Sequence, residues 1–316
     1  MNFNPETTAF VFPGQGSQKV GMGKELGATY PAAKAIFEEA DELLGISLST
    51  LAWDGPEDQL NDTINTQPAL LVHSVAAQRV FQELHPDFQP AFVAGHSLGE
   101  LSALVAAEAL DYPEALALVR KRGELMKRAG EENPGGMAAI LGLDIRQAEK
   151  AAVLASSNGE IVEIANDNCP GQVVISGHTE AVARAMEAAK EFGAKRALPL
   201  AVSIAAHSHL MAPAQKAFTE AINASGLRDA TLPVVGNVAA EPMREMAAIR
   251  ADLQAQLTST VRWTECVQFM RKQGVRTFIE LGSGSVLTGL LKRIDAEAIG
   301  ISLGEPEDFE KLVSSD

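Results

Sequence analysis

The chain has 316 residues, 46% of them hydrophobic, and its 41 acidic side chains outnumber the 26 basic ones to give a net charge of −15 at pH 7. This length can bury one large core with an insertion, or two smaller cores. The charge argues against a nucleic acid partner, and the lack of a long apolar run without charges argues against a membrane span.

The N-terminal residues carry no basic region, and the apolar run that follows them is too short for a signal peptide. Cys169 and Cys266 lie far apart in ordinary sequence, which predicts neither a disulfide framework nor a metal site. We therefore expect a cytoplasmic protein in a reducing compartment, without a bound metal.

The first predicted strand, Thr8–Pro13, runs into a glycine loop around Gln15. The third glycine of a dinucleotide-binding fingerprint is missing there, because Lys19 stands in its place. The loop is either an ordinary turn at the end of a strand or a backbone that offers an N–H group to an oxyanion. Apolar residues at helical spacing then predict helices over 32–44 and, after Gln67-Pro68, over 69–84.

A second apolar run ends at Gly95, and Ser97 follows between this glycine and Gly99, before a helical pattern that extends through residue 109. This order of strand, sharp turn and helix is typical of a nucleophile elbow, in which the serine hydroxyl projects from the turn. The Leu98 N–H would then point at the carbonyl that Ser97 attacks. Because serine is a poor nucleophile at neutral pH, the motif requires a base and a second oxyanion donor elsewhere in the chain. The alternative is a tight glycine turn without chemistry.

The next predicted helix begins after Asp111, which we interpret as the N-cap of a capping box with Glu114, and runs to about Ala129. At 100° per residue, Arg122 shares a face with apolar residues of this helix. A guanidinium on the core face needs an anionic partner. Either a substrate carboxylate or a structural ion pair with an acidic residue would meet this need.

A change in composition at 130–136 predicts a linker and the start of a second unit. Its order of strands and helices is β-α-β-β-α-β, the ferredoxin-like motif, and the unit is predicted to be an insertion. The polar segment 166–172 is predicted to be a loop that lines a cleft between the two units. The predicted elements are strands over 137–143, 161–165, 172–176 and 196–200, and helices over 145–155 and 179–192.

Two histidines follow the insertion, at the predicted junction between a strand over 201–204 and a helix that ends near Ile222. Either could be the general base for Ser97, because a histidine at the end of a strand shares the sheet edge where an elbow lies. His207 is favoured over His209 because it is closer to the strand. A strand over 275–281 and the turn after it complete the pattern of alternating strands and helices.

These motifs together resemble, in order and over nearly the whole chain, the malonyl-CoA:acyl carrier protein transacylases, the acyltransferases of type II fatty acid synthesis. The residues that carry the resemblance are Phe12-Pro13-Gly14-Gln15-Gly16-Ser17-Gln18, Gln67-Pro68-Ala69, Gly95-His96-Ser97-Leu98-Gly99-Glu100, Arg122-Gly123, Pro170-Gly171-Gln172-Val173-Val174-Ile175-Ser176-Gly177, Lys195-Arg196-Ala197-Leu198-Pro199-Leu200, the region up to His207, and Val286-Leu287-Thr288-Gly289-Leu290.

The resemblance implies an α/β fold, with an α/β-hydrolase-like core containing a parallel sheet and an inserted ferredoxin-like (βαββαβ) subdomain. The core would comprise residues 1–131 and 201–316, and the small subdomain residues 132–200.

The resemblance also implies a role for individual residues. Ser97 would be the acylated nucleophile and His207 its base, and the backbone N–H groups of Gln15 and Leu98 would form the oxyanion hole. Arg122, with Gln67 nearby, would bind the free carboxylate of the malonyl group. Gln256 would orient His207 through its backbone carbonyl, in place of the carboxylate of a catalytic triad.

The reaction that follows is a ping-pong transfer of malonyl from malonyl-CoA to Ser97 and then to the phosphopantetheine thiol of acyl carrier protein. It needs no metal or redox cofactor, since the coenzyme A thioester is a substrate, and we expect the protein to be a monomer. Two alternatives are a serine hydrolase or thioesterase that uses the same elbow, and a scaffold that only binds acyl carriers.

Overall fold

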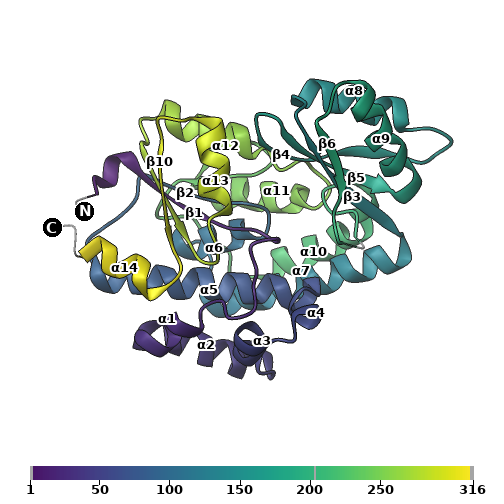
Figure 1. The fold of residues 1–316 in the computed structure, drawn as a ribbon. Coiled ribbons are helices and arrows are strands. Elements are labelled where there is room, and N and C mark those ends of the chain that lie inside the picture. Colours follow the sequence, from purple (N-terminus) through teal and green to yellow (C-terminus); the bar gives the residue numbers. More distant parts are fainter. Residues whose placement is uncertain (1–2, 203, 314–316) are drawn as a thin grey trace.

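The computed structural model describes residues 3–202 and 204–313, and their strands form two sheets, each covered by helices (Figure 1). The larger sheet has the strand order β10-β9-β1-β2-β7-β8. Its strands are β1 (Thr8–Phe12), β2 (Phe92–Gly95), β7 (Val234–Val235), β8 (Pro242–Met243), β9 (Thr277–Leu281) and β10 (Ile299–Leu303).

Neighbouring strands of the larger sheet are parallel, except for the antiparallel pair β7–β8. In the register of β1 with β2, Phe12 pairs with Gly95, so the two strands end side by side. The loops that carry Gln15 and Ser97 therefore meet at one edge of the sheet, which is where ligands bind in open α/β folds.

Helices cover both faces of the larger sheet (Figure 1). Successive β1 side chains alternate between two cores: Phe10 and Phe12 belong to one, and Ala9 and Val11 to the other. The helices outside the small unit are α1 (Lys24–Thr29), α2 (Pro31–Leu44), α3 (Leu48–Asp54), α4 (Glu57–Leu60), α5 (Thr63–Leu84), α6 (Gly99–Ala106), α7 (Tyr112–Glu132), α10 (Ala212–Ala224), α11 (Met246–Gln256), α12 (Trp263–Lys272), α13 (Val286–Ile294) and α14 (Pro306–Val313), with 3-10 turns at Pro5–Thr7 and His209–Met211.

The smaller sheet is antiparallel, with the strand order β4-β5-β3-β6. Its elements are β3 (Gly135–Leu141), α8 (Ile145–Ala155), β4 (Val162–Cys169), β5 (Gln172–His178), α9 (Thr179–Glu191) and β6 (Arg196–Pro199). This is the predicted β-α-β-β-α-β order with the pairing of a ferredoxin-like sheet. The predicted fold class, a parallel α/β-hydrolase-like core with an inserted ferredoxin-like unit, is confirmed.

The polar segment after residue 165 was predicted to be a loop, and this is wrong. Strand β4 continues to Cys169 and the hairpin turns at Pro170-Gly171, with two irregularities in the β4–β5 register. The backbone of Asp167 also donates to the Val261 carbonyl at 3.0 Å, which ties β4 to the larger unit. Polar side chains in a strand are tolerated here because Asn166 and Asn168 face a pocket rather than an apolar core.

Helix α5 begins at Thr63, earlier than predicted, and contains Pro68. A proline removes the hydrogen bond to the carbonyl four residues before it, here that of Ile64. The Ile64 carbonyl instead accepts from Arg120 Nη1 of α7 at 3.2 Å, and the same nitrogen donates to Asn65 Oδ1 at 3.0 Å. A contact between helices thus replaces the bond within the helix, and α5 continues through the proline.

Two other local predictions are corrected. Helix α7 does begin after Asp111, but there is no capping box: the Asp111 carboxylate binds Arg228 at 2.6 Å, and Glu114 accepts from the Gly226 N–H at 3.1 Å. Helix α6 ends at Ala106, not at residue 109, because Glu108 adopts a positive φ of 56°.

The predicted strand over 201–204 is absent from the described residues of that segment, while Ser203 lies outside them. His207 is in a turn, with a positive φ of 59°. The predicted linker is also short, since only Asn133 and Pro134 separate α7 from β3. The division into residues 1–131 with 201–316 and residues 132–200 stays a prediction. Within 3–202 and 204–313, no helix is both long and apolar enough to cross a membrane.

Candidate active site

Ser97 lies in a sharp turn between β2 and α6, with a φ of 53° that a non-glycine residue rarely adopts. The turn depends on close backbone contacts: a Cβ atom on Gly95 would lie 1.9 Å from the Gly99 carbonyl, and one on Gly99 would lie 2.3 Å from the Phe12 oxygen. Asn237 spans the turn, because its Oδ1 accepts from the Ser97 N–H and its Nδ2 donates to the Gly95 carbonyl, both at 2.7 Å. These contacts hold a strained residue in place.

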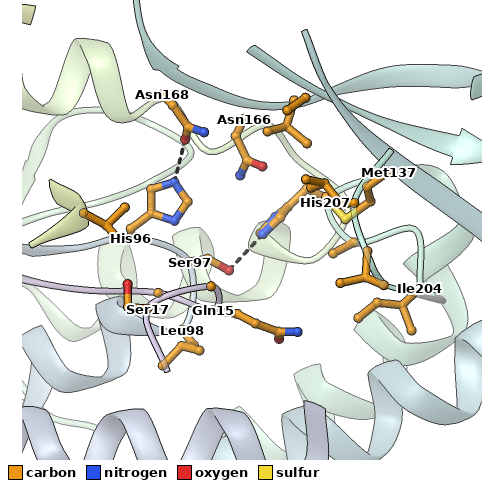
Figure 2. Close-up of a pocket in the computed structure, with 18 of the residues that line it drawn as sticks. Gln15, Ser17, His96, Ser97, Leu98, Met137, Asn166, Asn168, Ile204 and His207 are labelled. Carbon is orange, nitrogen blue, oxygen red and sulfur yellow. Dashed lines mark hydrogen bonds between the residues drawn. The ribbon is translucent and has the colours of Figure 1, made fainter. Parts of the chain in front are cut away.

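His207 faces Ser97 across the site (Figure 2), with 2.8 Å between Ser97 Oγ and His207 Nε2. The other ring nitrogen, Nδ1, lies 2.9 Å from the Gln256 backbone carbonyl, which can only accept. Nδ1 must therefore carry the proton, and Nε2 has a free lone pair that accepts the Ser97 hydroxyl proton. This is the arrangement of a nucleophile with its general base.

Arg122 is 2% exposed, so the prediction that it lies on the buried face of its helix is confirmed. Its Nη1 donates to Gln67 Oε1 at 2.7 Å, and its Nη2 donates to Gln256 Oε1 at 2.9 Å and to Ser97 Oγ at 3.0 Å. All three partners are neutral, and no ion pair involves Arg122 within the described part of the chain. Burial lowers the pKa of the guanidinium to about 10, so it is still charged at pH 7.

The Gln67 and Gln15 side chains both form a hydrogen bond with the Thr63 hydroxyl. The Thr63 hydroxyl donates to Gln15 Oε1 at 3.0 Å and accepts from Gln67 Nε2 at 2.9 Å. Gln67 is thereby turned so that its oxygen faces Arg122. The Gln15 side chain points to α5, which leaves its backbone as the part that can meet a ligand.

Gln15 and Leu98 line the same pocket as Ser97 and His207 (Figure 2). They follow the adjacent strand ends of β1 and β2. Two N–H groups on such neighbouring turns can stabilise an oxyanion beside the serine.

The pocket has a volume of about 270 Å³ and lies between the two sheets. The smaller unit contributes mixed polar and apolar side chains, and α13 contributes an apolar wall. Its lining includes Met126, Met137, Asn166, Asn168, Gln172, Val174, Leu200, Val202, Ile204, Ala206, Val286, Leu287 and Leu290. A pocket with largely apolar walls and a few polar groups suits a long flexible ligand that ends at Ser97.

The pKa of His207 is lowered to about 3, first by its burial and second by the positive charge of Arg122. The imidazole is therefore neutral at pH 7 and ready to accept a proton. His209, by contrast, points to the smaller unit, where its Nδ1 lies 2.8 Å from Glu163 Oε2. Of the two candidate bases, only His207 contacts Ser97.

Sequence reasoning gave no role to several residues that contact the predicted site. Asn237 holds the elbow, and His96 Nε2 donates to Asn168 Oδ1 at 2.8 Å on the pocket wall (Figure 2). Glu100 is fully buried and binds Gln256. Only Glu100 had a signal in the sequence, as a carboxyl group inside an otherwise apolar helix. Asn237 lies in a short loop after β7 with no motif around it.

Comparison with known proteins identifies a family whose sequence pattern this chain matches. Residues 9–301 match the acyl transferase domain. The chain is 48% identical over 307 residues to the malonyl CoA-acyl carrier protein transacylase of Bacillus subtilis (strain 168). This alignment covers 97% of this chain and 96% of the relative.

Two solved structures of similar proteins superpose on nearly the whole of this chain. An acyl carrier protein S-malonyltransferase from Vibrio cholerae O1 biovar eltor superposes with a TM-score of 0.93 at 46% identity, over 97% of this chain and 99% of the other. A malonyl-transacylase in complex with its type II PKS acyl-carrier protein superposes with a TM-score of 0.94 at 44% identity, over 98% of this chain and 99% of the other.

Proposed function

The chain belongs to the acyl transferase family, among the malonyl CoA-acyl carrier protein transacylases, and from that membership we propose how its own residues carry out the reaction. The enzyme transfers malonyl from malonyl-CoA to Ser97, and then from Ser97 to the phosphopantetheine thiol of acyl carrier protein. The product is the activated malonyl unit for fatty acid synthesis. Both half-reactions use the same pocket, because the acyl group stays on Ser97 between them and His207 is the base in each.

The observation that carries this proposal is the buried charge of Arg122, which lies 3.0 Å from Ser97 Oγ and has no ion-pair partner within the described chain. In a malonyl ester only one methylene separates the reacting carbonyl from the free carboxylate, so the carboxylate must lie within a few ångströms of Oγ. Arg122 is at that distance and can bind it through two N–H groups. An acyl group without a carboxylate would leave the charge unpaired.

In the first half-reaction, the Ser97 hydroxyl proton passes to His207 Nε2 while Oγ attacks the thioester carbonyl. The N–H groups of Leu98 and Gln15 stabilise the oxyanion. The C–S bond then breaks, and the coenzyme A sulfur leaves with the proton from His207. In the second half-reaction, the carrier thiol gives its proton to His207 and attacks the ester carbonyl, and the same proton returns to Ser97 Oγ.

The Gln256 carbonyl orients His207 but carries no full negative charge to stabilise an imidazolium ion. The imidazolium is therefore a strong acid, which suits the return of its proton to the coenzyme A thiolate in the first half-reaction and to the Ser97 alkoxide in the second. His207 needs only to hold the proton briefly, which agrees with its low pKa of about 3.

The low pKa of His207 gives an expected pH dependence. The free enzyme needs neutral His207, and its pKa in the folded protein lies far below the ordinary 6.5. The rate constant for Ser97 acylation should therefore stay level as the pH falls from about 7 to about 5, where an ordinary histidine would already be protonated. Rapid-quench measurement of the acylated protein across this range is the test. A loss of half the rate near pH 6.5 would contradict the role of burial.

The second expected result concerns acyl selectivity. Replacing Arg122 with alanine removes a charge-assisted contact, which should lower the preference for malonyl-CoA over acetyl-CoA by about 10–200-fold. The ratio of the two kcat/KM values measures this directly. Lys121→Ala, at an exposed position on the same helix, is the matched control and should keep the ratio. Parallel losses for both acyl groups would mean that Arg122 only supports Gln67 and Gln256.

We also propose that the protein acts as a cytoplasmic monomer, with malonyl-CoA and acyl carrier protein as its partners and without nucleic acid or a membrane. The names of the relatives support the two partners. The monomeric state can be tested by sedimentation equilibrium, in which a larger mass would overturn it.

Mass spectrometry of the intact protein tests the function itself. After mixing with malonyl-CoA, the protein should gain the mass of one malonyl group, and addition of acyl carrier protein should move that group to the carrier. Hydrolysis of the adduct at the same rate without a carrier would instead indicate a thioesterase. Absence of any adduct would indicate a scaffold.

A further inference from the structure

Glu100 is a buried acidic residue that the reaction above does not use. It lies in the first turn of α6, close to Ser97 in sequence, and is 0% exposed. Its Oε2 accepts from Gln256 Nε2 at 2.8 Å and from the Asn237 N–H at 3.3 Å. Burial first, and the nearby Asp252 carboxyl second, raise the pKa of Glu100 well above its ordinary value. Oε2 is thus the acceptor for both donors.

Gln256 is the residue through which Glu100 reaches the site. Its Nε2 donates to Glu100 Oε2 and, at 3.1 Å, to the Ser97 backbone carbonyl. Its Oε1 accepts from Arg122 Nη2 at 2.9 Å. A guanidinium can only donate, so the Gln256 amide must turn its oxygen to Arg122. Glu100 Oε2 accepts from the nitrogen of the same amide, so it stabilises this orientation relative to the flipped one.

We propose that Glu100 is a positioning residue for malonyl transfer, which fixes the orientation of the Gln256 amide and thereby aims the Arg122 guanidinium at the carboxylate of the acyl group. This inference rests on the function proposed above. A flipped amide would present its NH₂ group to the guanidinium, and Arg122 would lose a partner that holds it beside Ser97.

Two substitutions separate hydrogen bonding from mere packing. Glu100→Gln is neutral and keeps an acceptor oxygen for Gln256 and Asn237. Glu100→Met fills similar space without an acceptor. The glutamine variant should keep the malonyl-to-acetyl ratio of kcat/KM within about threefold, whereas the methionine variant should lower it by about tenfold, as expected for a buried donor left unpaired.

Either of two results would overturn the proposal. An unchanged ratio in both variants would show that Glu100 does not influence Arg122, and equal damage in both would show that an acceptor oxygen alone does not suffice. Glu280→Gln is the control for loss of a buried carboxyl, because Glu280 is also 0% exposed but accepts from the Leu287 and Thr288 N–H groups and not from Gln256 or Arg122. It should leave the ratio unchanged.

A double-mutant cycle covers the case in which Glu100→Met folds poorly. Glu100→Leu also removes the acceptor oxygen and should lower the ratio in the wild-type background. If Glu100 acts through Gln256, Glu100→Leu should have no further effect on the ratio in a Gln256→Met background. A full effect in that background would contradict the route through Gln256. The wild-type protein is tested first for its malonyl adduct, and absence of this adduct would contradict the proposed function. If the adduct forms, results in the variants that differ from those expected would contradict only the role of Glu100.

Discussion

Ser97→Ala should leave no covalent malonyl adduct after incubation with malonyl-CoA, while the protein remains folded. The hydroxyl is the attacking group, whereas the turn is held by Asn237 and by the close approach of Gly95 and Gly99. Alanine at a φ of 53° is about as strained as serine, so the elbow itself should persist. Intact-protein mass spectrometry reads out the adduct, and circular dichroism reads out the fold.

Ser102→Ala is the matched control for this experiment. Ser102 is fully buried in α6, the helix that follows Ser97, and it is not among the residues that line the pocket. This variant should acquire one malonyl group as the wild type does. An adduct on the Ser97→Ala protein would mean that another side chain is the nucleophile, and the proposed mechanism would have to be abandoned.

The second large effect is expected at His207. Replacing it with alanine removes the acceptor 2.8 Å from Ser97 Oγ, and general-base assistance contributes on the order of 10²–10⁴-fold. The rate of Ser97 acylation should fall by about that factor in rapid-quench assays. His209→Ala should change the rate little, because His209 binds Glu163 instead. Similar losses in the two variants would show that neither histidine is the base, or that both act only on the fold.

The fold class was predictable because its signals are local and repeated. Each strand of the larger sheet ends at, or is followed within two residues by, a glycine or polar residue, and the smaller unit has six elements in an order that few folds share. Elements without a clear apolar period were not predicted. Helices α1, α3 and α4 are short and gain their stability from packing against α2 and α5 rather than from their own sequence.

The site was predictable to the extent that its residues sit in motifs. Ser97 has glycines on both sides, and Arg122 is a charge on an apolar face. What the sequence could not provide is the contact between distant parts of the chain. No residue near Asn237 in the sequence indicates that its side chain binds the backbone of the Ser97 turn. Likewise, no residue near Asp111 indicates that its carboxylate binds Arg228 instead of capping the helix.

The proline in α5 has a consequence for how this protein can change over generations. Because Pro68 leaves the Ile64 carbonyl to Arg120, the register between the two helices that carry Gln67 and Arg122 depends on a pair of positions far apart in the chain. Replacing Arg120 alone leaves the Ile64 carbonyl without this donor, whereas replacing Pro68 alone restores an N–H group that can share the carbonyl with Arg120, because a carbonyl oxygen can accept two hydrogen bonds. We therefore expect descendants of this sequence to lose Arg120 more readily once Pro68 has been replaced, although neither residue touches the acyl group.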